Sequence, residues 1–402
     1  MQSGGAKQNL RAAWGWLALL GLLAIGQHFL ANGRPLYCRI GDAMYFPGLR
    51  LIWAAPERPY GVPVLDSIAR DPLLWKTYPY QSAVFAPIPF TPGEWFPRPA
   101  CNLAPPGTAH PDLPPRFRHW LGTDAQGRDV AAGMIAGARI ALLTGALATL
   151  AAFGLGLLLG GVAGYFGDKR LKMRRGVLAG SLLGLAIGAV WSWILPQTGW
   201  PASYALLPAG IGALSGGFMA LLCARRGFGN TAIGLPADLL IMRVAEIFNA
   251  VPRLILIVAL AAMSARQSTW LMIGLIGLFS WTDVAQFIRA EMLRIREMEY
   301  IAAARGMGLP ELRVLGRHAL PNALRPALVV CAFGVGNAIL LEASLSFLGF
   351  GGQDFQGISW GSLLQNVVQH RQAWWLAVPP GLAIGLTIYM LNRFGDAKSS
   401  VY

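Results

Sequence analysis

Acidic and hydroxyl side chains inside long apolar runs have the most chemistry to offer in this sequence. Asp283 is the only acid of the run 269–288, and Glu342 shares the run 327–347 with Ser344. A charge at membrane depth costs about 2.5–3.5 kcal/mol on insertion scales, so such an acid should face the protein interior or a water path. Both acids are therefore candidates for binding a solute or carrying protons. Glu342 equally suits a structural hydrogen bond to a facing helix.

Two further charges, Arg243 and Glu246, lie three residues apart near the start of the run 238–263. Residues at that spacing are neighbours on a helix surface and can pair. The pattern favours interfacial charges that reach toward water over a direct role in transport, but it leaves both interpretations open.

Motifs of enzyme chemistry are absent from the sequence. It contains neither a GxxxxGK[ST] phosphate loop nor an HExxH motif, and its five histidines do not cluster with an acid and a Ser or Cys. The four cysteines lack CxxC or zinc spacing. We therefore expect no enzyme activity, no metal and no cofactor in this chain. Cys38 and Cys101 fall in a predicted external loop, where a disulfide is chemically allowed but not required.

The composition indicates a polytopic membrane protein. Of 402 residues, 55% are hydrophobic and only 13% are charged, and the mean hydropathy is +0.48. The formal net charge of +14 would also fit a nucleic-acid-binding protein. Much of it, however, lies in short loops beside apolar runs, where it sets membrane topology, so we expect no nucleic-acid partner.

The apolar runs and their flanking charges predict the order of segments. Lys7 and Arg11 precede the first span, 14–31, and so place the N-terminus in the cytoplasm. A proline-rich external part of irregular β character follows, with a short hairpin over 36–46. The segment 169–236 holds two apolar runs, 177–195 and 203–224, that suit an inserted transmembrane hairpin. The predicted domains are 1–31 (cytoplasmic tail and first transmembrane helix), 32–135 (external loop domain), 136–168 (second transmembrane helix), 169–236 (inserted hairpin) and 237–402 (the remaining core).

The polar, Arg-rich segment 289–326 lies between two apolar runs and predicts a structured loop on one side of the membrane. A first helix over 300–307 should stop at Gly308, and Pro310 suits the first turn of a second helix from Glu311. We expect the second helix to end at residues 320–322. Two short helices on this side of a membrane protein offer a surface to a soluble partner.

This loop resembles the coupling loop of ABC-importer permeases, most closely those of the dipeptide/oligopeptide and nickel family, second-permease type. The matching residues are Tyr300, Ala303, Ala304, Arg305, Gly308, Leu320 and Pro321. Ala302 stands where the family usually has a Glu, so an ion pair of that Glu with the ATPase would be missing here.

A second string is similar to the LGTDxxGRD signature that precedes the second span in the same permeases. Considered alone, it predicts a turn bracketed by two glycines, with acids and an arginine that can pair with one another. The residues are Gly122, Thr123, Asp124, Gly127, Arg128 and Asp129. The sequence from Glu342 to Gly351 also matches, as does Trp360-Gly361, and the long external loop suggests the microcin/peptide-permease subgroup.

The resemblance implies an all-α polytopic fold with about eight transmembrane helices, six of the core and two of the hairpin. It further implies a permease subunit in the bacterial inner membrane, with both termini cytoplasmic. Expected partners are a second, different permease, two ATPase subunits that bind ATP and Mg²⁺, an external solute-binding protein and the lipid bilayer. Di- and oligopeptides are the expected cargo, although close relatives carry nickel chelates.

Three other classes of function can be weighed against this one. A proton-coupled secondary transporter would use Asp283 and Glu342, but it has no evident need for a docking loop. An intramembrane enzyme lacks catalytic motifs, and an anchored receptor does not explain eight spans. The sequence leaves open the solute, the residues that contact it and the role of the hairpin.

Overall fold

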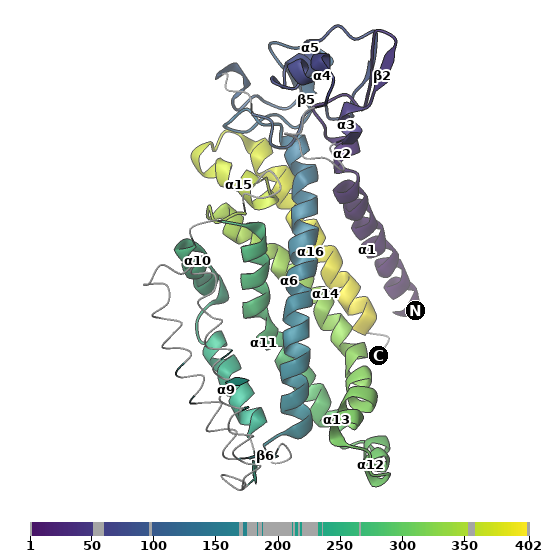
Figure 1. Ribbon diagram of the computed structural model, residues 1–402, viewed down its shortest axis with the longest axis vertical. Helices are drawn as coiled ribbons and strands as arrows, with labels where there is room; N and C mark the ends of the chain where they lie inside the picture. The colour runs from purple at the N-terminus through teal and green to yellow at the C-terminus, as the bar shows by residue number, and fades with distance from the viewer. Residues whose placement is uncertain are drawn as a thin grey trace. The chain divides into compact units, whose positions relative to one another are not determined.

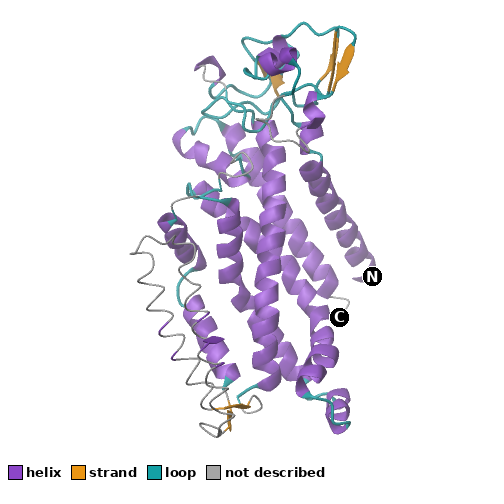
Figure 2. Cartoon of the chain, viewed as in Figure 1, coloured by secondary structure: helices purple, strands orange, loops and turns teal. Residues whose placement is uncertain are grey.

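The computed structural model describes residues 2–50, 60–95, 99–168, 172–174, 232–234, 236–264, 267–352 and 358–399, with isolated positions between 183 and 218. The chain divides into two compact units. One unit comprises residues 1–157, 248–287 and 321–402, and the other comprises 158–247 and 288–320. Helices make up most of the described residues, and the strands are short (Figure 2).

The helices and strands follow one another along the chain with these bounds (Figure 1). They are α1 (Gln2–Ile25), α2 (Gln27–Leu30), β1 (Tyr37–Ile40), β2 (Ala43–Tyr45), α3 (Pro47–Arg50), α4 (Pro63–Ile68), α5 (Leu74–Thr77), β3 (Ser82–Val84), η1 (Pro99–Cys101), β4 (Thr108–Ala109), β5 (Arg118–His119), α6 (Val130–Phe166), β6 (Lys172–Arg174), β7 (Ala232–Gly234), α9 (Ala237–Asn249), α10 (Arg253–Met263), α11 (Thr269–Ile295), α12 (Glu299–Gly306), α13 (Glu311–Val314), η4 (Leu315–Ala319), α14 (Leu320–Phe347), α15 (Trp360–Gln369), η6 (Trp374–Leu376) and α16 (Val378–Ser399).

Four helical stretches in the described part of the chain are long and apolar enough to cross a membrane. They are Val130–Phe166, Thr269–Ile295, Glu311–Phe347 and Trp374–Ala397. The pair α9 and α10 adds a fifth if its two halves form one span, and it breaks at Pro252. The first predicted span has a shorter apolar helical part, Arg11–Ile25. The all-α polytopic fold is thus confirmed, and the two predicted spans of the hairpin lie outside the described residues.

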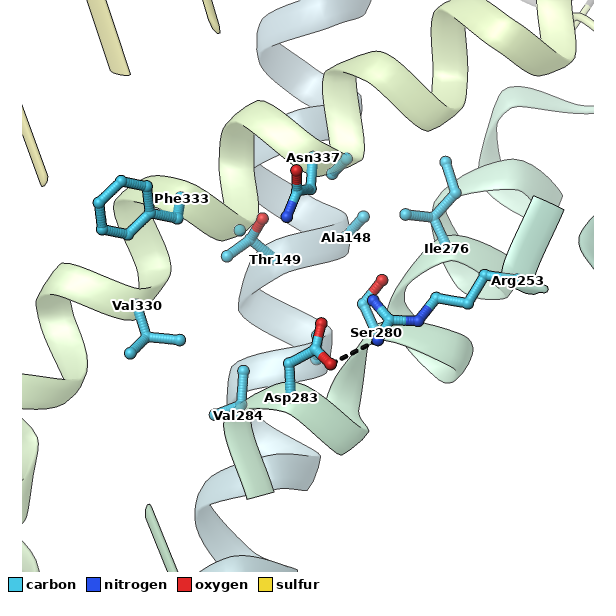
Figure 3. Close-up of a pocket in the computed structure, with 13 residues that line it drawn as sticks. Ala148, Thr149, Arg253, Ile276, Ser280, Asp283, Val284, Val330, Phe333 and Asn337 are labelled. Atoms are coloured by element: carbon cyan, nitrogen blue, oxygen red, sulfur yellow. Dashed lines mark hydrogen bonds and ion pairs between the residues drawn. The ribbon is translucent and has the colours of Figure 1, made fainter. Parts of the chain in front are cut away.

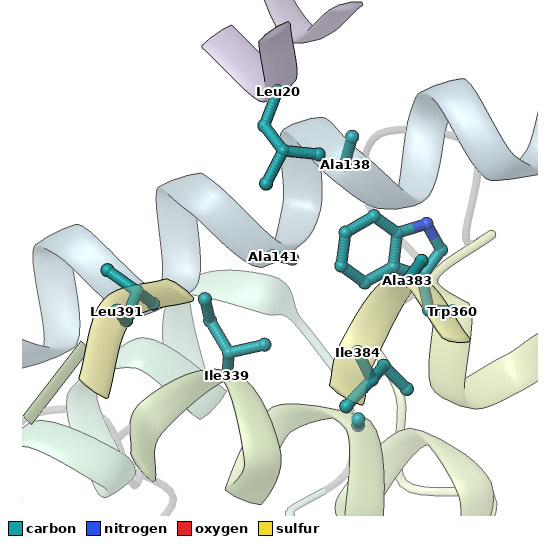
Figure 4. Packing of buried hydrophobic residues seen from close by; sticks show 9 residues of the cluster. Leu20, Ala138, Ala141, Ile339, Trp360, Ala383, Ile384 and Leu391 are labelled. Carbon is teal, nitrogen blue, oxygen red and sulfur yellow. The ribbon is translucent and has the colours of Figure 1, made fainter. Parts of the chain in front are cut away.

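Helix α1 packs along α16, and the two helices run in opposite directions. The rings of Trp14 and Phe394 meet edge to face at 5.3 Å, and Trp16 Nε1 donates to Thr387 Oγ1 at 3.2 Å. Further along α1, Leu20 joins Ile384 in one apolar cluster (Figure 4). Residues near the two ends of the chain therefore lie at the same end of this helix pair.

Trp360 at the start of α15 is the largest side chain of that cluster and packs on α6 at a glycine. Its Nε1 donates to the carbonyl of Met134 at 2.9 Å, and a Cβ on Gly137 would lie only 2.3 Å from the indole Cδ1. Small residues let helices approach closely where lipid provides no hydrophobic driving force between them. The neighbouring Gly361 lies as tightly against Ala343 of α14, because its Cβ would be 2.2 Å from that carbonyl oxygen. The Trp-Gly pair thus fixes α15 against α6 and α14.

The external part contains the predicted hairpin and three further strands, β3, β4 and β5. β1 pairs with β2 across a turn at Gly41, whose φ is +60°, and also with β3, which gives the strand order β2-β1-β3. A buried ion pair joins Lys76 to Glu94 at 2.5 Å, and burial lowers the pKa of Lys76. Cys38 and Cys101 are separate buried thiols with no disulfide between them, and Cys101 Sγ lies 3.4 Å from His110 Nε2.

The predicted end of the second loop helix at residues 320–322 is wrong. Helix α13 continues through the wide turn η4 into α14, so that Glu311–Phe347 forms one long helical stretch. The wide turn explains how Pro321 is accommodated. A π-type turn loosens the hydrogen-bond ladder just before the residue that has no N–H to donate.

Candidate functional site

A cavity of about 170 Å³ lies among four helices of the first unit, α6, α10, α11 and α14. Figure 3 shows polar and charged side chains reaching into it from several of its walls. The polar ones are Thr149, Arg253, Ser280, Asp283 and Asn337. Because α6, α11 and α14 belong to the predicted spans, the cavity places polar and charged groups among apolar helices.

Arg253 and Asp283 form an ion pair at the cavity wall. The guanidinium Nη2 of Arg253, from the first turn of α10, donates to Asp283 Oδ1 in the middle of α11. The side chain of Asp283 is 49% exposed and that of Arg253 24%. The acid therefore lines the cavity, and a cation compensates its charge, which lowers the cost of a charge among apolar helices.

The other polar groups around the cavity come from three helices. The hydroxyl of Thr149 on α6 is buried and has no hydrogen-bond partner among the described residues. The amide of Asn337 on α14 points into the same space (Figure 3). Nearby, Thr282 Oγ1 donates to Asn249 Oδ1 at 3.0 Å, which links α11 to the end of α9. The cavity thus holds charges of both signs and neutral donors and acceptors.

Glu342 and Ser344 do not line this cavity. Glu342 is only 2% exposed and accepts a hydrogen bond from Ser346 Oγ at 2.7 Å. Ser344 Oγ donates to the carbonyl of Leu340 on its own helix. These contacts favour the structural interpretation of Glu342 over the pathway one.

Arg243 and Glu246 pair at 2.7 Å on the surface of α9. Their side chains are 67% and 58% exposed. An exposed pair at i and i+3 contributes only about 0.3–0.5 kcal/mol to a helix. The geometry matches the interfacial interpretation.

The loop between α11 and α14 forms two helices joined at Gly308. Gly308 has a φ of +75°, which ends α12, and α13 begins after Pro310. Ile301 and Val314 are buried, whereas Met307 and Leu312 are 72% and 74% exposed. The loop therefore shows two large apolar side chains to its surroundings, on either side of the turn.

A hydrogen-bond network holds the loop to the last turn of α6 within the second unit. Tyr165 Oη donates to Glu311 Oε2 at 2.6 Å, and Arg305 Nε lies 3.3 Å from Glu311 Oε1. The guanidinium of Arg305 also lies over the Tyr165 ring, 5.2 Å from its centroid. Tyr165 and Arg305 thus share the carboxylate of Glu311 on α13.

Charged groups on α9 and α11 form a second network in this unit. Arg289 makes two hydrogen bonds to the carboxylate of Asp238, and Asp168 Oδ1 accepts from the backbone N–H of Leu239 at 3.0 Å. Arg296 donates to the carbonyl of Gly164 at 3.3 Å. Bidentate arginine pairs fix geometry as well as charge, so these contacts join the ends of α6, α9 and α11.

The residues of the 122–129 signature form a compact turn in the external part, held together by hydrogen bonds and an ion pair. Gly122 and Gly127 have φ values of +76° and +77°, and Asp124 pairs with Arg128 at 2.7 Å. Asp129 does not pair with either of them. Its Oδ2 lies 2.8 Å from His119 Nδ1, and its Oδ1 caps α6 by accepting from the N–H of Ala132.

Thr123 hydrogen-bonds this turn to neighbouring segments of the chain. Its hydroxyl donates to the carbonyl of Cys101 at 2.6 Å and accepts from the N–H of Ala104, while its carbonyl accepts from Trp375 Nε1 at 3.0 Å. Thr123, Asp124 and Asp129 are all buried. The signature residues thus position the start of α6 and do not form an open site.

Sequence reasoning missed Arg253, Thr149 and Tyr165. Arg253 was detectable, because it lies well inside the apolar run 238–263 and the cost that marked Asp283 applies to it as well. Its partner is 30 residues away, so no local spacing reveals the pair. Thr149 and Tyr165 are ordinary residues in a helix until the neighbouring helices are known.

Comparison with known proteins assigns this arrangement to a class. Residues 214–397 match the model of the family described as binding-protein-dependent transport system inner membrane component. The inner membrane ABC transporter permease protein YejE of Escherichia coli K12 is 28% identical over 401 residues, 98% of this chain and 94% of that protein. The peptidoglycan transport system permease protein YejE of Agrobacterium fabrum is 27% identical, with 98% and 90% covered. A Brucella suis protein that carries the name of a peptide permease is 28% identical over 72% of this chain and 74% of its own.

The helical fold, the family match and the named relatives all make the chain similar to ABC-transporter permeases. The predicted resemblance is confirmed. The chain carries a match to this transport-system domain over residues 214–397, and its long apolar helices make it a multi-pass membrane protein.

Proposed function

We propose that this permease imports di- and oligopeptides and that ATP hydrolysis on partner subunits drives it through the loop from α12 to η4. The observation that carries the proposal is the form of that loop. It presents Met307 and Leu312 to solvent, while its inner face is held to α6 by Tyr165 and Glu311. Such a surface can receive a soluble ATPase and pass its movement to a spanning helix.

The route from this loop to the cavity is continuous in the chain. η4 leads into α14, and the same helix contributes Phe333 and Asn337 to the cavity. A movement of the loop would therefore act on a helix that lines the proposed path. Coupling of this kind requires that the ATPase contact the loop differently in its two states.

The remaining partners and the topology follow from the same proposal. A second, related permease would supply the other half of the pathway, and a binding protein would deliver the solute from outside. Two ATPase subunits would hold ATP and Mg²⁺, while this chain would hold neither and catalyse no reaction itself. The loop from α12 to η4 and both termini would lie on the cytoplasmic side of the bacterial inner membrane, which agrees with the basic flanks and with the packing of α1 on α16.

Peptide cargo is supported by the names of relatives. The Brucella suis relative is named as a peptide permease, and the Agrobacterium fabrum relative is named for peptidoglycan transport. Both names describe solutes that contain peptide bonds. We therefore propose peptides, and not nickel chelates, as the solute class of this chain.

The test is affinity purification of the tagged chain in gentle detergent, followed by mass spectrometry and by peptide uptake in proteoliposomes. We expect a second permease and ATPase subunits to copurify and uptake to require ATP. A chain that purifies alone and moves solute in ATP-free vesicles would instead be a secondary transporter. Copurification of these subunits without peptide uptake would refute only the proposal that peptides are the cargo.

A further inference from the structure

The ion pair of Arg253 and Asp283 is open to a solute in the cavity. The two residues come from different helices, α10 and α11, and a pair sealed in packing would show little surface. Here the carboxylate side chain is 49% exposed and the guanidinium side chain 24%. Both groups line the cavity (Figure 3). A solute that enters it meets an acceptor for cations and a donor for anions side by side.

A buried hydroxyl without a hydrogen-bond partner among the described residues lies at the same cavity and is a second, independent sign of a ligand. Thr149 is 6% exposed, and its hydroxyl has no partner among the described residues. A buried hydroxyl without a partner is unfavourable, and native proteins usually satisfy such groups. Asn337 and Ser280 supply further polar groups to the same space. A bound solute with peptide groups would satisfy them.

Charge balance decides which solutes suit this site. Separating this partly exposed ion pair leaves two uncompensated charges beside the apolar walls of the cavity, which is unfavourable. A zwitterion avoids that cost, because its ammonium group can take the place of Arg253 beside Asp283 and its carboxylate the place of Asp283 beside Arg253. The summed charge of site and solute stays at zero before and after binding. A solute with one charged end leaves one partner unpaired.

The size and walls of the cavity restrict the solute further. A volume of about 170 Å³ is below the roughly 300–1,000 Å³ of sites that bury drug-sized ligands. Ile276, Val330 and Phe333 give it apolar walls between the polar groups. A short peptide, or the end of a longer one, matches this mixture.

We propose that this cavity recognises the charged termini of short zwitterionic peptides, with Asp283 binding the ammonium group, Arg253 the carboxylate and Thr149 a peptide group. The inference rests on the proposed peptide import. It identifies the two charged termini as the part of the solute that the permease itself binds.

Equilibrium binding to the purified complete transporter tests the two charged residues. Titration calorimetry without the binding protein would compare alanylalanine with its N-acetylated and its C-amidated forms, so that preferences of the binding protein cannot enter. We expect the free dipeptide to bind on the order of tenfold more tightly than either blocked form. Asp283→Asn should remove the preference over the N-acetylated form alone, and Arg253→Gln the preference over the amidated form alone.

Two threonines on α6 provide a matched pair of variants that keep both charges. Thr144 and Thr149 both have buried hydroxyls without a partner among the described residues, but only Thr149 lines the cavity. Thr149→Val should weaken binding of the free dipeptide about fivefold, while Thr144→Val should leave it unchanged. The melting temperature of the complex shows whether a charge variant assembles. If it does not, the two threonine variants still test the proposal.

The outcomes separate this inference from the proposed function. If the wild-type transporter imports peptides but binds free and blocked forms equally, the recognition of termini is wrong and peptide import stands. Equal weakening of all three ligands by Asp283→Asn and Arg253→Gln would make the pair structural and would also overturn the inference. A transporter that assembles but imports no peptide refutes the proposed cargo, and the inference falls with it.

Discussion

At the residue scale, the loop depends on the backbone of Gly308. Its φ of +75° lies in the left-handed region, where an L-residue costs about 1–2 kcal/mol, and no atom lies within 4 Å of a Cβ built there. A larger residue would therefore act through backbone strain and not through a clash. The turn between α12 and α13 is the part that would change shape.

We predict that Gly308→Leu strongly reduces uptake while the amount of chain in the membrane stays at the wild-type level. Gly306→Leu is the control, because Gly306 has equally open space and no positive φ. Transport assays and immunoblots of membranes would measure both quantities. Full uptake by the Gly308 variant would argue against the loop as the coupling element.

Cys38 offers a residue-scale test of pH dependence in the external part. Burial raises the pKa of its thiol from 9.0 to about 11. Between these values the unfolded chain has lost the proton and the folded chain has kept it, so the contribution of Cys38 to stability falls as pH rises from 9 to 11.

The thiolate is the reactive form of cysteine, so we expect alkylation of Cys38 to be slow at neutral pH. In a chain whose other cysteines are replaced, the labelling rate of native protein should rise with a midpoint near pH 11. The denatured chain should show its midpoint near pH 9. Rapid labelling of native protein at neutral pH would show that the thiol is not protected.

At the element scale, the packing of α15 on α6 depends on the space left by one glycine. A Cβ on Gly137 would lie 2.3 Å from Trp360 Cδ1, and the indole cannot yield easily because its Nε1 is bonded to Met134. We predict that Gly137→Ala destabilises the protein by about 1–3 kcal/mol, the usual cost of overpacking. Gly154→Ala, on the same helix with no atom within 4 Å, should be neutral in a thermal melt. Equal melting temperatures for the two variants would contradict this packing.

The contact between α6 and α13 predicts a coupling defect. Tyr165→Phe keeps the ring under Arg305 but removes the hydrogen bond to Glu311, worth about 1 kcal/mol. We expect ATP hydrolysis by the assembled transporter to respond less to the binding protein, with uptake reduced in proportion. Tyr389→Phe is the control, because Tyr389 lies exposed on α16. Unchanged stimulation in the Tyr165 variant would show that the loop transmits movement by another contact.

Sequence patterns predicted the helices well and their ends less well. Apolar runs located the four long helical spans, and Gly308 with Pro310 located the turn of the loop. Pro321 was misread as a helix end, because nothing local reveals the wide turn that accommodates it. The pairing of Arg253 with Asp283 also required the fold, since it joins two helices.

At the scale of the whole molecule, β6 and β7 form an antiparallel pair that brings together two distant points of the chain. Lys172 is paired with Gly234, and Arg174 with Ala232. These strands flank the predicted inserted hairpin. An antiparallel pair of this kind needs only a two-residue turn to close it.

We predict that residues 175–231 can be replaced by Asn-Gly with the assembly of the transporter intact. Copurification of the partner subunits with the shortened chain would measure this, and loss of that copurification would show that the segment supports the core. The matched control deletes the same number of residues from the external part, where the contacts of Thr123 and Asp129 make loss of assembly the expected result.

In evolutionary terms, the β6–β7 pair marks a point at which a gene can gain or lose the intervening segment in one step. The pairing is made by residues 172–174 and 232–234, which lie outside the segment between them. A change of length between these two strands would leave unaltered the residues that pair and the helices on either side of them in the sequence.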